Sequence, residues 1–162
     1  MFKKVFVFFI MVFVFFMFTS LNCFASGVDI GDGIKTGMTL NEVDDKFDLE
    51  HFKTSRGLAS YHKSGTGTYY FFNKNNKKLI YKLVVIHDKK WDKIENMLNK
   101  KCGDPVIKKD SKGNKVYFFA DGDTGFKMSK NEMFDDAWQL WYGSISMWDD
   151  LAKNNGMNKF PE

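Results

Sequence analysis

Cysteine, proline and arginine are all scarce in this chain of 162 residues, which has two cysteines, two prolines and Arg56 as its one arginine. Cys23 lies in an apolar N-terminal segment, so Cys102 is the one cysteine beyond it. A lone cysteine cannot close an internal disulfide, which excludes a disulfide-stapled scaffold. The 23 lysines are scattered among acidic residues, and one arginine offers little for forked phosphate or base contacts. We therefore expect no nucleic-acid partner.

Motifs of catalysis and metal binding are also missing. The chain has no P-loop, no Gly-x-Ser-x-Gly elbow, no His-Glu-x-x-His and no Cys-x-x-Cys, and its three histidines (His51, His62 and His87) are dispersed. Residues 121–135 begin like a calcium loop and place Glu132 at position 12, but Gly and Phe stand at positions 5 and 6. We expect no catalytic residues, no metal ligands and no cofactor, and hence no enzyme.

The first 25 residues account for much of the apparent hydrophobicity, since they hold 20 hydrophobic residues and 9 of the 18 phenylalanines. Two lysines precede an unbroken apolar run over residues 5–18, and small residues stand at positions −3 and −1 of a cut after Ala25. This pattern predicts a signal peptide over residues 1–25 and a secreted or periplasmic protein. The run is shorter than the roughly 20 residues of a membrane-spanning helix. The alternatives are an uncleaved signal anchor and lipid attachment at Cys23.

Residues 26–162 then form one exported domain. They hold 22 lysine and arginine residues against 20 acidic ones, a net charge of +2. Thr39 and Glu42 form a capping box at the start of a first helix, whose apolar stripe is Leu40, Val43 and Phe47. The pattern of residues 50–58 fits either a second helical turn or a loop, and it does not decide between them.

Runs of β-branched and aromatic residues separated by polar turns predict antiparallel strands. A second helix begins near Asp88, bears the stripe Trp91, Ile94 and Leu98, and ends at Gly103. The polar tail, residues 154–162, is expected to fray. The predicted strands span residues 59–63, 68–73, 78–87, 106–109, 115–120 and 137–147, with a weaker strand at 126–128.

A shift of 51 residues places the stripe of the first helix on that of the second. This spacing predicts two α-β-β-β units, at about residues 34–87 and 88–150. The fold class expected is α+β, with the units forming one antiparallel sheet and both helices packed on one face.

Residues 34–43 (Ile-Lys-Thr-Gly-Met-Thr-Leu-Asn-Glu-Val) resemble the "G-M-T-x-x-x-V" helix opening of the SmpA/OmlA (BamE)-like envelope proteins. Residues 94–105 are similar to the "L-x-x-K-x-G-x-P" helix ending of such exported proteins. Tandem helix-plus-meander units also resemble the β-lactamase inhibitory proteins. The resemblance implies a binding or assembly module rather than an enzyme, and it identifies no partner.

Aromatic residues in the predicted strands are the candidate partner-binding residues: Tyr69, Phe71, Trp138, Trp141 and Tyr142. Because side chains alternate along a strand, one set of rings is expected to pack in the core and the other to face outward. Exposed Tyr and Trp on a rigid sheet suit the docking of another protein or an envelope component. The alternatives are packing alone, a hydrolase acting on an envelope polymer, and a membrane-anchored structural protein, with membrane contact expected only through an uncleaved signal.

Overall fold

The structure is a computed structural model that describes residues 27–131 and 136–161. The predicted signal peptide, residues 1–25, and Glu132 of the candidate calcium loop lie outside these ranges. Within them, no helix has the length and apolar character needed to cross a membrane.

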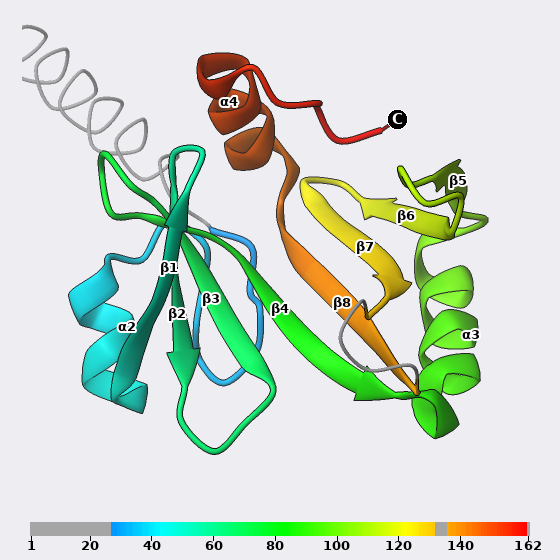
Figure 1. The fold of residues 1–162 in the computed structure, drawn as a ribbon, viewed down its shortest axis with the longest axis horizontal. Coiled ribbons are helices and arrows are strands. Elements are labelled where there is room, and N and C mark those ends of the chain that lie inside the picture. Colours follow the sequence, from blue (N-terminus) through cyan, green and yellow to red (C-terminus); the bar gives the residue numbers. More distant parts are fainter. Residues whose placement is uncertain (1–26, 132–135, 162) are drawn as a thin grey trace, which may run out of the picture.

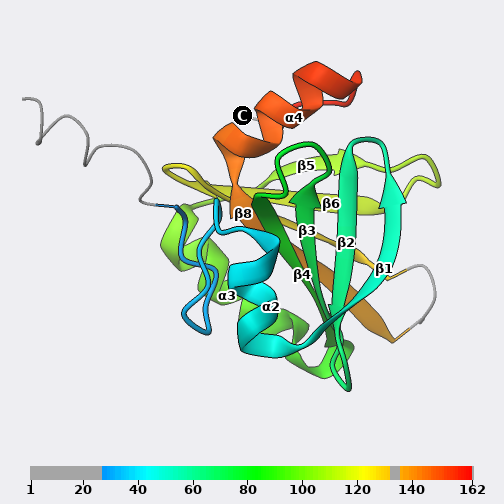
Figure 2. The same ribbon diagram turned by 90° about the vertical axis from the view of Figure 1, so that its left-hand side faces the viewer.

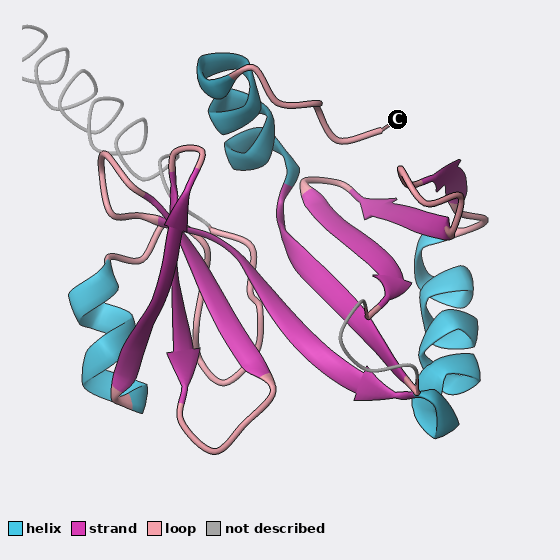
Figure 3. Ribbon diagram, viewed as in Figure 1, coloured by secondary structure: helices cyan, strands magenta, loops and turns pink. Residues whose placement is uncertain are grey.

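The described residues form an α+β fold with one eight-stranded antiparallel sheet and three α-helices (Figures 1 and 3). This confirms the predicted class and the antiparallel sheet. In chain order the elements are α2 (Leu40–Phe47), β1 (Leu49–Ser55), β2 (Leu58–Lys63), β3 (Thr68–Asn73), β4 (Leu79–His87), the 3-10 turn η1 (Asp88–Lys90), α3 (Trp91–Cys102), β5 (Val106–Lys109), β6 (Lys115–Asp121), β7 (Thr124–Lys130), β8 (Ala137–Ser144) and α4 (Ile145–Asn155).

The sheet consists of two runs of consecutive strands that meet in its centre. The strand order is β1-β2-β3-β4-β8-β7-β6-β5, so β1 and β5 are the edges. Antiparallel pairing of β4 with β8, from Tyr81↔Gly143 to His87↔Ala137, joins the two runs (Figure 1). Helices α2 and α3 are each followed by four strands, where units of three strands are predicted from the sequence.

The extra strand of the first run is β1, in the segment left open between helix and loop. A two-residue turn at Arg56 and Gly57 connects it to β2, and both residues have positive φ, 44° and 79°. Such a turn suits the twist of an antiparallel hairpin. The pairing with β2, rather than local propensity, therefore makes this segment a strand.

Both predicted helices are confirmed, together with their end signals. Glu42 Oε2 accepts the Thr39 backbone N–H at 2.7 Å, and Thr39 Oγ1 accepts the Glu42 N–H at 3.4 Å, which completes the capping box of α2. Helix α3 ends at Gly103, whose φ of 81° suits a residue without a side chain.

Side chains of the sheet alternate between two faces, which we name the helix face and the α4 face. Helices α2 and α3 cover the helix face, where Val43 packs with Tyr70 and Phe72, and Leu98 packs with Met128. Figure 1 shows α2 and α3 at opposite ends of the sheet, and Figure 2 shows α4 apart from both of them.

Helix α4 is absent from the sequence-based prediction, in which a strand continues to residue 147. The strand ends at Ser144, whose Oγ accepts the Met147 N–H at 3.2 Å as a helix cap. The carboxylate of Asp123, in the β6–β7 turn, accepts the Ser144 hydroxyl at 2.6 Å and the Ser146 N–H at 2.8 Å. Leu151 of α4 then packs in a cluster on the α4 face. Only two helices on one face are predicted, and this third helix corrects that arrangement.

The polar tail is held in place, which corrects the expectation that it frays. The Trp148 indole N–H donates to the Asn158 carbonyl at 3.1 Å. The Phe160 N–H donates to Asp149 Oδ1 at 2.7 Å, and the Phe160 ring meets Phe118 of β6 edge-on at 5.6 Å. The tail and α4 thus cover part of the α4 face.

Candidate functional site

The five aromatic residues predicted to bind a partner are divided between the two faces of the sheet. Tyr69 pairs with Leu83, which pairs with Trp141, so these three share one row of the α4 face. Phe71 lies on the same face, in the cluster that includes Leu151 of α4. The remaining two, from β8, lie on the helix face.

Trp138 and Tyr142 are engaged in packing on the helix face. The Trp138 ring stacks on Trp91 of α3, with centroids 3.4 Å apart. The Tyr142 hydroxyl donates to the Ile30 carbonyl at 2.7 Å, and its ring stacks on Phe126 at 6.0 Å. Their contacts are with α3, β7 and the lead-in, residues 27–38, so the structure separates them from the other three predicted residues.

Three rings form a compact cluster on the α4 face. Phe71, Tyr81 and Trp141 meet pairwise at centroid distances of 4.6, 5.1 and 5.1 Å. Trp148 of α4 closes one side by meeting Tyr81 at 5.4 Å. Burial raises the pKa of the Tyr81 hydroxyl. Helix α4 therefore occupies the end of this face where Phe71 and Tyr81 lie.

The aromatic surface continues beyond α4 to the β1 edge of the sheet. Phe52, 57% exposed, meets Tyr69 edge-on at 5.2 Å, and His62 lies 5.3 Å from the same ring. We name Phe52, His62, Tyr69 and Trp141 the aromatic row. The β1–β2 register shifts between His51 and Lys53, which places Phe52 at a bulge.

Sequence reasoning missed Phe52 because it lies in the segment 50–58, for which no element was predicted. The available signal was the Arg56-Gly57 pair next to the strand-like run that became β2. Asn-Gly and Asp-Gly are the usual pairs in such turns, and Arg-Gly is a weaker turn signal.

A lysine lies beside the aromatic row. Lys127 of β7 pairs with Trp141 in the ladder, and its Nζ is 5.1 Å from the Trp141 ring centroid, within cation–π range. Burial lowers the pKa of Lys127, against an opposing effect of Asp110. The Trp141 indole N–H donates to Gln139 Oε1 at 3.3 Å. The row thus combines rings with a partly desolvated cation.

Three groups that could serve metal or thiol chemistry have structural contacts in the fold: Asp121, Asp123 and Cys102. Asp121 pairs with Lys101 at 3.3 Å, and Asp123 caps α4, so two carboxylates of the candidate calcium loop have structural roles. Burial and the nearby Asp121 raise the pKa of the half-buried Cys102 thiol, which opposes thiolate formation. The described ranges contain no cluster of three or more His, Cys, Asp or Glu side chains suited to a metal ion.

A buried lysine on the helix face was not predicted. Lys82 lies in the row of Tyr70 and Tyr142, and its Nζ donates to the Ile30 carbonyl at 3.0 Å and lies 3.4 Å from Asp32 Oδ2. Burial, followed by Asp32 and Tyr142, raises the pKa of Tyr70 to about 12. Lys82 fastens the lead-in over the middle of the sheet. The sequence did contain a signal for this buried lysine, because Lys82 is flanked by apolar residues within the predicted strand 78–87.

Comparisons with family models, with curated proteins and with solved structures return no match. The resemblance to SmpA/OmlA (BamE)-like and β-lactamase inhibitory proteins therefore stays a prediction.

Proposed function

We propose that this chain is an exported, non-catalytic binding module that docks a partner protein on the aromatic row of the α4 face. The observation that supports this most directly is the exposure of Phe52. Its side chain is 57% exposed, and its ring contacts the Tyr69 ring edge-on with centroids 5.2 Å apart. A large ring held on a sheet loses little conformational entropy on binding. Aromatic anchors of this kind dominate the energetics of protein interfaces.

The charges on this face favour a partner surface that is both apolar and acidic. Register places Lys53 of β1 and Lys127 of β7 on the α4 face, with Glu50 as an opposing charge. An acidic residue aimed at Lys127 would lie beside Trp141, while apolar groups cover Phe52. Complementary charge of this kind raises association rates and excludes wrong partners. Envelope assembly or inhibition of another protein is the corresponding role.

Export is part of the same proposal. The basic start, the apolar run over residues 5–18 and the small residues before a cut after Ala25 support it. Mass spectrometry of the exported chain tests it: a terminus at Ser26 supports a cleaved signal, whereas an intact terminus supports the signal anchor. Lipid attachment would give a mature chain that begins at a modified Cys23.

We also propose that the fold arose from two copies of one helix-plus-strands unit. The elements run helix and four strands twice, and each run of strands begins at an edge of the sheet and ends at its centre. The shift of 51 residues between the stripes of α2 and α3 supports the same idea. A relation to the BamE-like and β-lactamase inhibitory proteins is proposed on this arrangement and on the two helix-end motifs.

The docking proposal is tested by replacing one exposed ring and comparing it with a matched residue elsewhere. Phe52→Ser removes the anchor, while Met97→Ser alters a residue of α3 that is also 57% exposed. Each variant is used in pull-downs from envelope extract, and each captured protein is then purified and its affinity measured. We expect binding to fall at least tenfold for Phe52→Ser and to stay unchanged for Met97→Ser. Equal affinity of both variants would overturn the docking proposal.

A further inference from the structure

Charge is unevenly distributed over the exported part of the chain, although its net charge is only +2. Residues 40–50, which include α2, contain five acidic residues and one lysine, a net charge of −4. Residues 89–115, which include α3 and β5, contain nine lysines and four acidic residues, a net charge of +5. Figure 1 shows α2 and α3 at opposite ends of the sheet. Two surfaces of opposite charge therefore lie far apart on one molecule.

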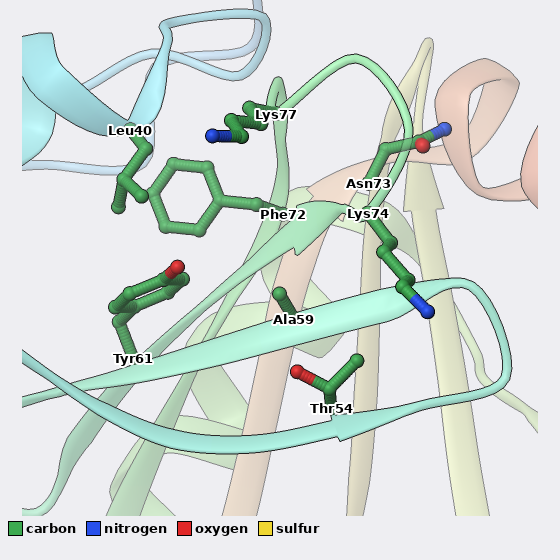
Figure 4. Close-up of a pocket in the computed structure, with 8 residues that line it drawn as sticks. All are labelled: Leu40, Thr54, Ala59, Tyr61, Phe72, Asn73, Lys74 and Lys77. Carbon is green, nitrogen blue, oxygen red and sulfur yellow. The ribbon is translucent and has the colours of Figure 1, made fainter.

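Helix α2 turns acidic side chains away from the sheet. Val43 packs with Phe72 of β3 in the core, and Figure 4 shows Leu40 beside the same ring. At 3.6 residues per turn, Asp45 lies on the side of the helix opposite Val43. Asp45 is exposed, and so is Asp48, the residue that caps the end of the helix. The outward surface of α2 is therefore negative.

Helix α3 turns lysines outward, while Trp91 and Leu98 pack in the core. Lys93 and Lys100 are two helical turns apart, and both lie exposed on the side opposite Leu98. Lys89, in the 3-10 turn before the helix, is exposed as well. None of these three lysines has an ion-pair partner within residues 27–131 and 136–161. The outward surface of α3 is therefore positive.

Helices α2 and α3 cover the same face of the sheet, so one twofold rotation can join both surfaces at once. When two copies oppose their helix faces about such an axis, α2 of each copy meets α3 of the other, because twofold contacts are reciprocal. A single exposed ion pair contributes little free energy. A contact that is made twice, with several charges on each side, contributes more.

We propose that the chain forms a reversible dimer in which the acidic surface of α2 docks on the basic surface of α3 of a second copy, at two equivalent contacts. Charge complementarity favours this partner, because the chain itself supplies the acidic surface that fits the lysines of α3. An anionic membrane or an acidic foreign protein would use α3 alone and would leave α2 without a partner. The dimer keeps both α4 faces on its outer sides, so the proposal does not depend on docking at the aromatic row.

Sedimentation velocity of the purified exported chain over a range of concentrations measures the association. We expect a dimer at about 20 mM salt and a dissociation constant at least tenfold higher at about 300 mM salt, because salt screens exposed charges. A chain that stays monomeric at the lower salt, or a dimer whose dissociation constant does not change with salt, would overturn the proposal. A monomer that instead sediments with phosphatidylglycerol vesicles, or binds polyglutamate, would assign the lysines of α3 to a different partner and would overturn it as well.

Charge reversal on each helix gives the sharpest comparison. The triple variant Lys89→Glu/Lys93→Glu/Lys100→Glu changes the net charge of residues 89–115 from +5 to −1. The triple variant Asn41→Lys/Asp45→Lys/Asp48→Lys changes that of residues 40–50 from −4 to +1. Each variant alone should be monomeric, because its two surfaces carry charge of the same sign. An equimolar mixture of the two should dimerise, because each surface again meets the opposite charge.

The control is Lys153→Glu/Lys159→Glu, which changes exposed lysines of α4 and the tail, and it should dimerise like the wild-type chain. Circular dichroism and thermal unfolding equal to those of the wild-type chain verify that each variant is folded. Dimers that survive either triple variant, or a mixture of the two folded variants that stays monomeric, would exclude the contact between α2 and α3.

Discussion

Trp138 of β8 lies face to face with Trp91 of α3, with ring centroids 3.4 Å apart and an interplanar angle of 18°. Trp91 also meets Tyr117 of β6 at 5.7 Å, so the stack joins the helix to two strands of the sheet. Aromatic pairs of this kind add to the stabilisation that comes from burial alone. Trp138 is a docking candidate in the sequence because it lies in a predicted strand. Its contact with Trp91 explains why it packs inside the fold instead.

Trp138→Ala is expected to lower the free energy of unfolding by about 3 kcal/mol, because it removes a large ring from a packed contact. Trp138→Phe keeps a ring there and should cost about half as much. Urea denaturation followed by circular dichroism measures both. Met97→Ala, at an exposed position of the same helix, should change stability by no more than about 0.5 kcal/mol. A loss below about 1 kcal/mol for Trp138→Ala would contradict the packing role.

Tyr70→Phe is expected to stabilise the protein at neutral pH by about 1 kcal/mol. Tyr70 is fully buried, and its hydroxyl has no hydrogen-bond partner among the described residues, so the hydroxyl loses its hydration without compensation. Thermal and urea unfolding of both chains give the difference. A destabilisation of similar size would show that the hydroxyl has a partner in solution, such as a bound water.

The raised pKa of Tyr70 also leads us to expect a loss of stability at alkaline pH. Burial, then Asp32 and Tyr142, raises the pKa of Tyr70 from 10 to about 12, so the folded state favours the neutral phenol. The contribution of this raised pKa to the free energy of unfolding is fully present below pH 10 and is lost as the pH rises from 10 to about 12. The fall in unfolding free energy across that window should be shallower in Tyr70→Phe. Equal slopes for the two chains would exclude Tyr70 as the titrating group.

Several elements were predictable because their signals are local. The capping box of Thr39 and Glu42 starts α2, and β3 (Thr68–Asn73) and β5 (Val106–Lys109) have the bounds predicted from the sequence. Helix α4 was missed although Ser144 is a local cap, because the strand pattern continues past it and Asp123, which completes the cap, comes from a turn 21 residues earlier. The contribution of Asp123 leaves no local pattern.

The candidate site was predictable only in part, for a related reason. Alternation along β8 correctly separates Trp141 from Trp138, but it does not say which face a helix covers. That depends on contacts between distant segments, such as Trp91 with Trp138. The exposed position of Phe52 also depends on register, because it lies at a bulge in the pairing of β1 with β2.

Lys82→Met should release the lead-in without unfolding the sheet. The Lys82 amine is held by the Ile30 carbonyl at 3.0 Å, while Asp32 is largely exposed, so methionine removes the anchor and keeps the packing volume. Hydrogen exchange of the amides of Ile34 and Thr36 should accelerate at least tenfold. Lys78→Met, at an exposed neighbouring position, is the control. Unchanged exchange in Lys82→Met would show that the Lys82 amine does not hold the segment.

Gly57→Ala tests whether α4 reaches the β1–β2 turn. Gly57 has φ of 79°, and an added Cβ would lie 2.5 Å from the side-chain oxygen of Asn155, near the end of α4. Gly65 has a similar φ of 71° but open space around it, so Gly65→Ala measures the backbone cost alone, about 1 kcal/mol. Gly57→Ala should cost more than Gly65→Ala and should speed hydrogen exchange in α4, because Asn155 must move. The double variant Gly57→Ala/Asn155→Ala, measured against Asn155→Ala, should bring the cost of the alanine back to that at Gly65. Equal costs for the two single glycine variants, with no change in α4, would show that the helix does not touch this turn in solution.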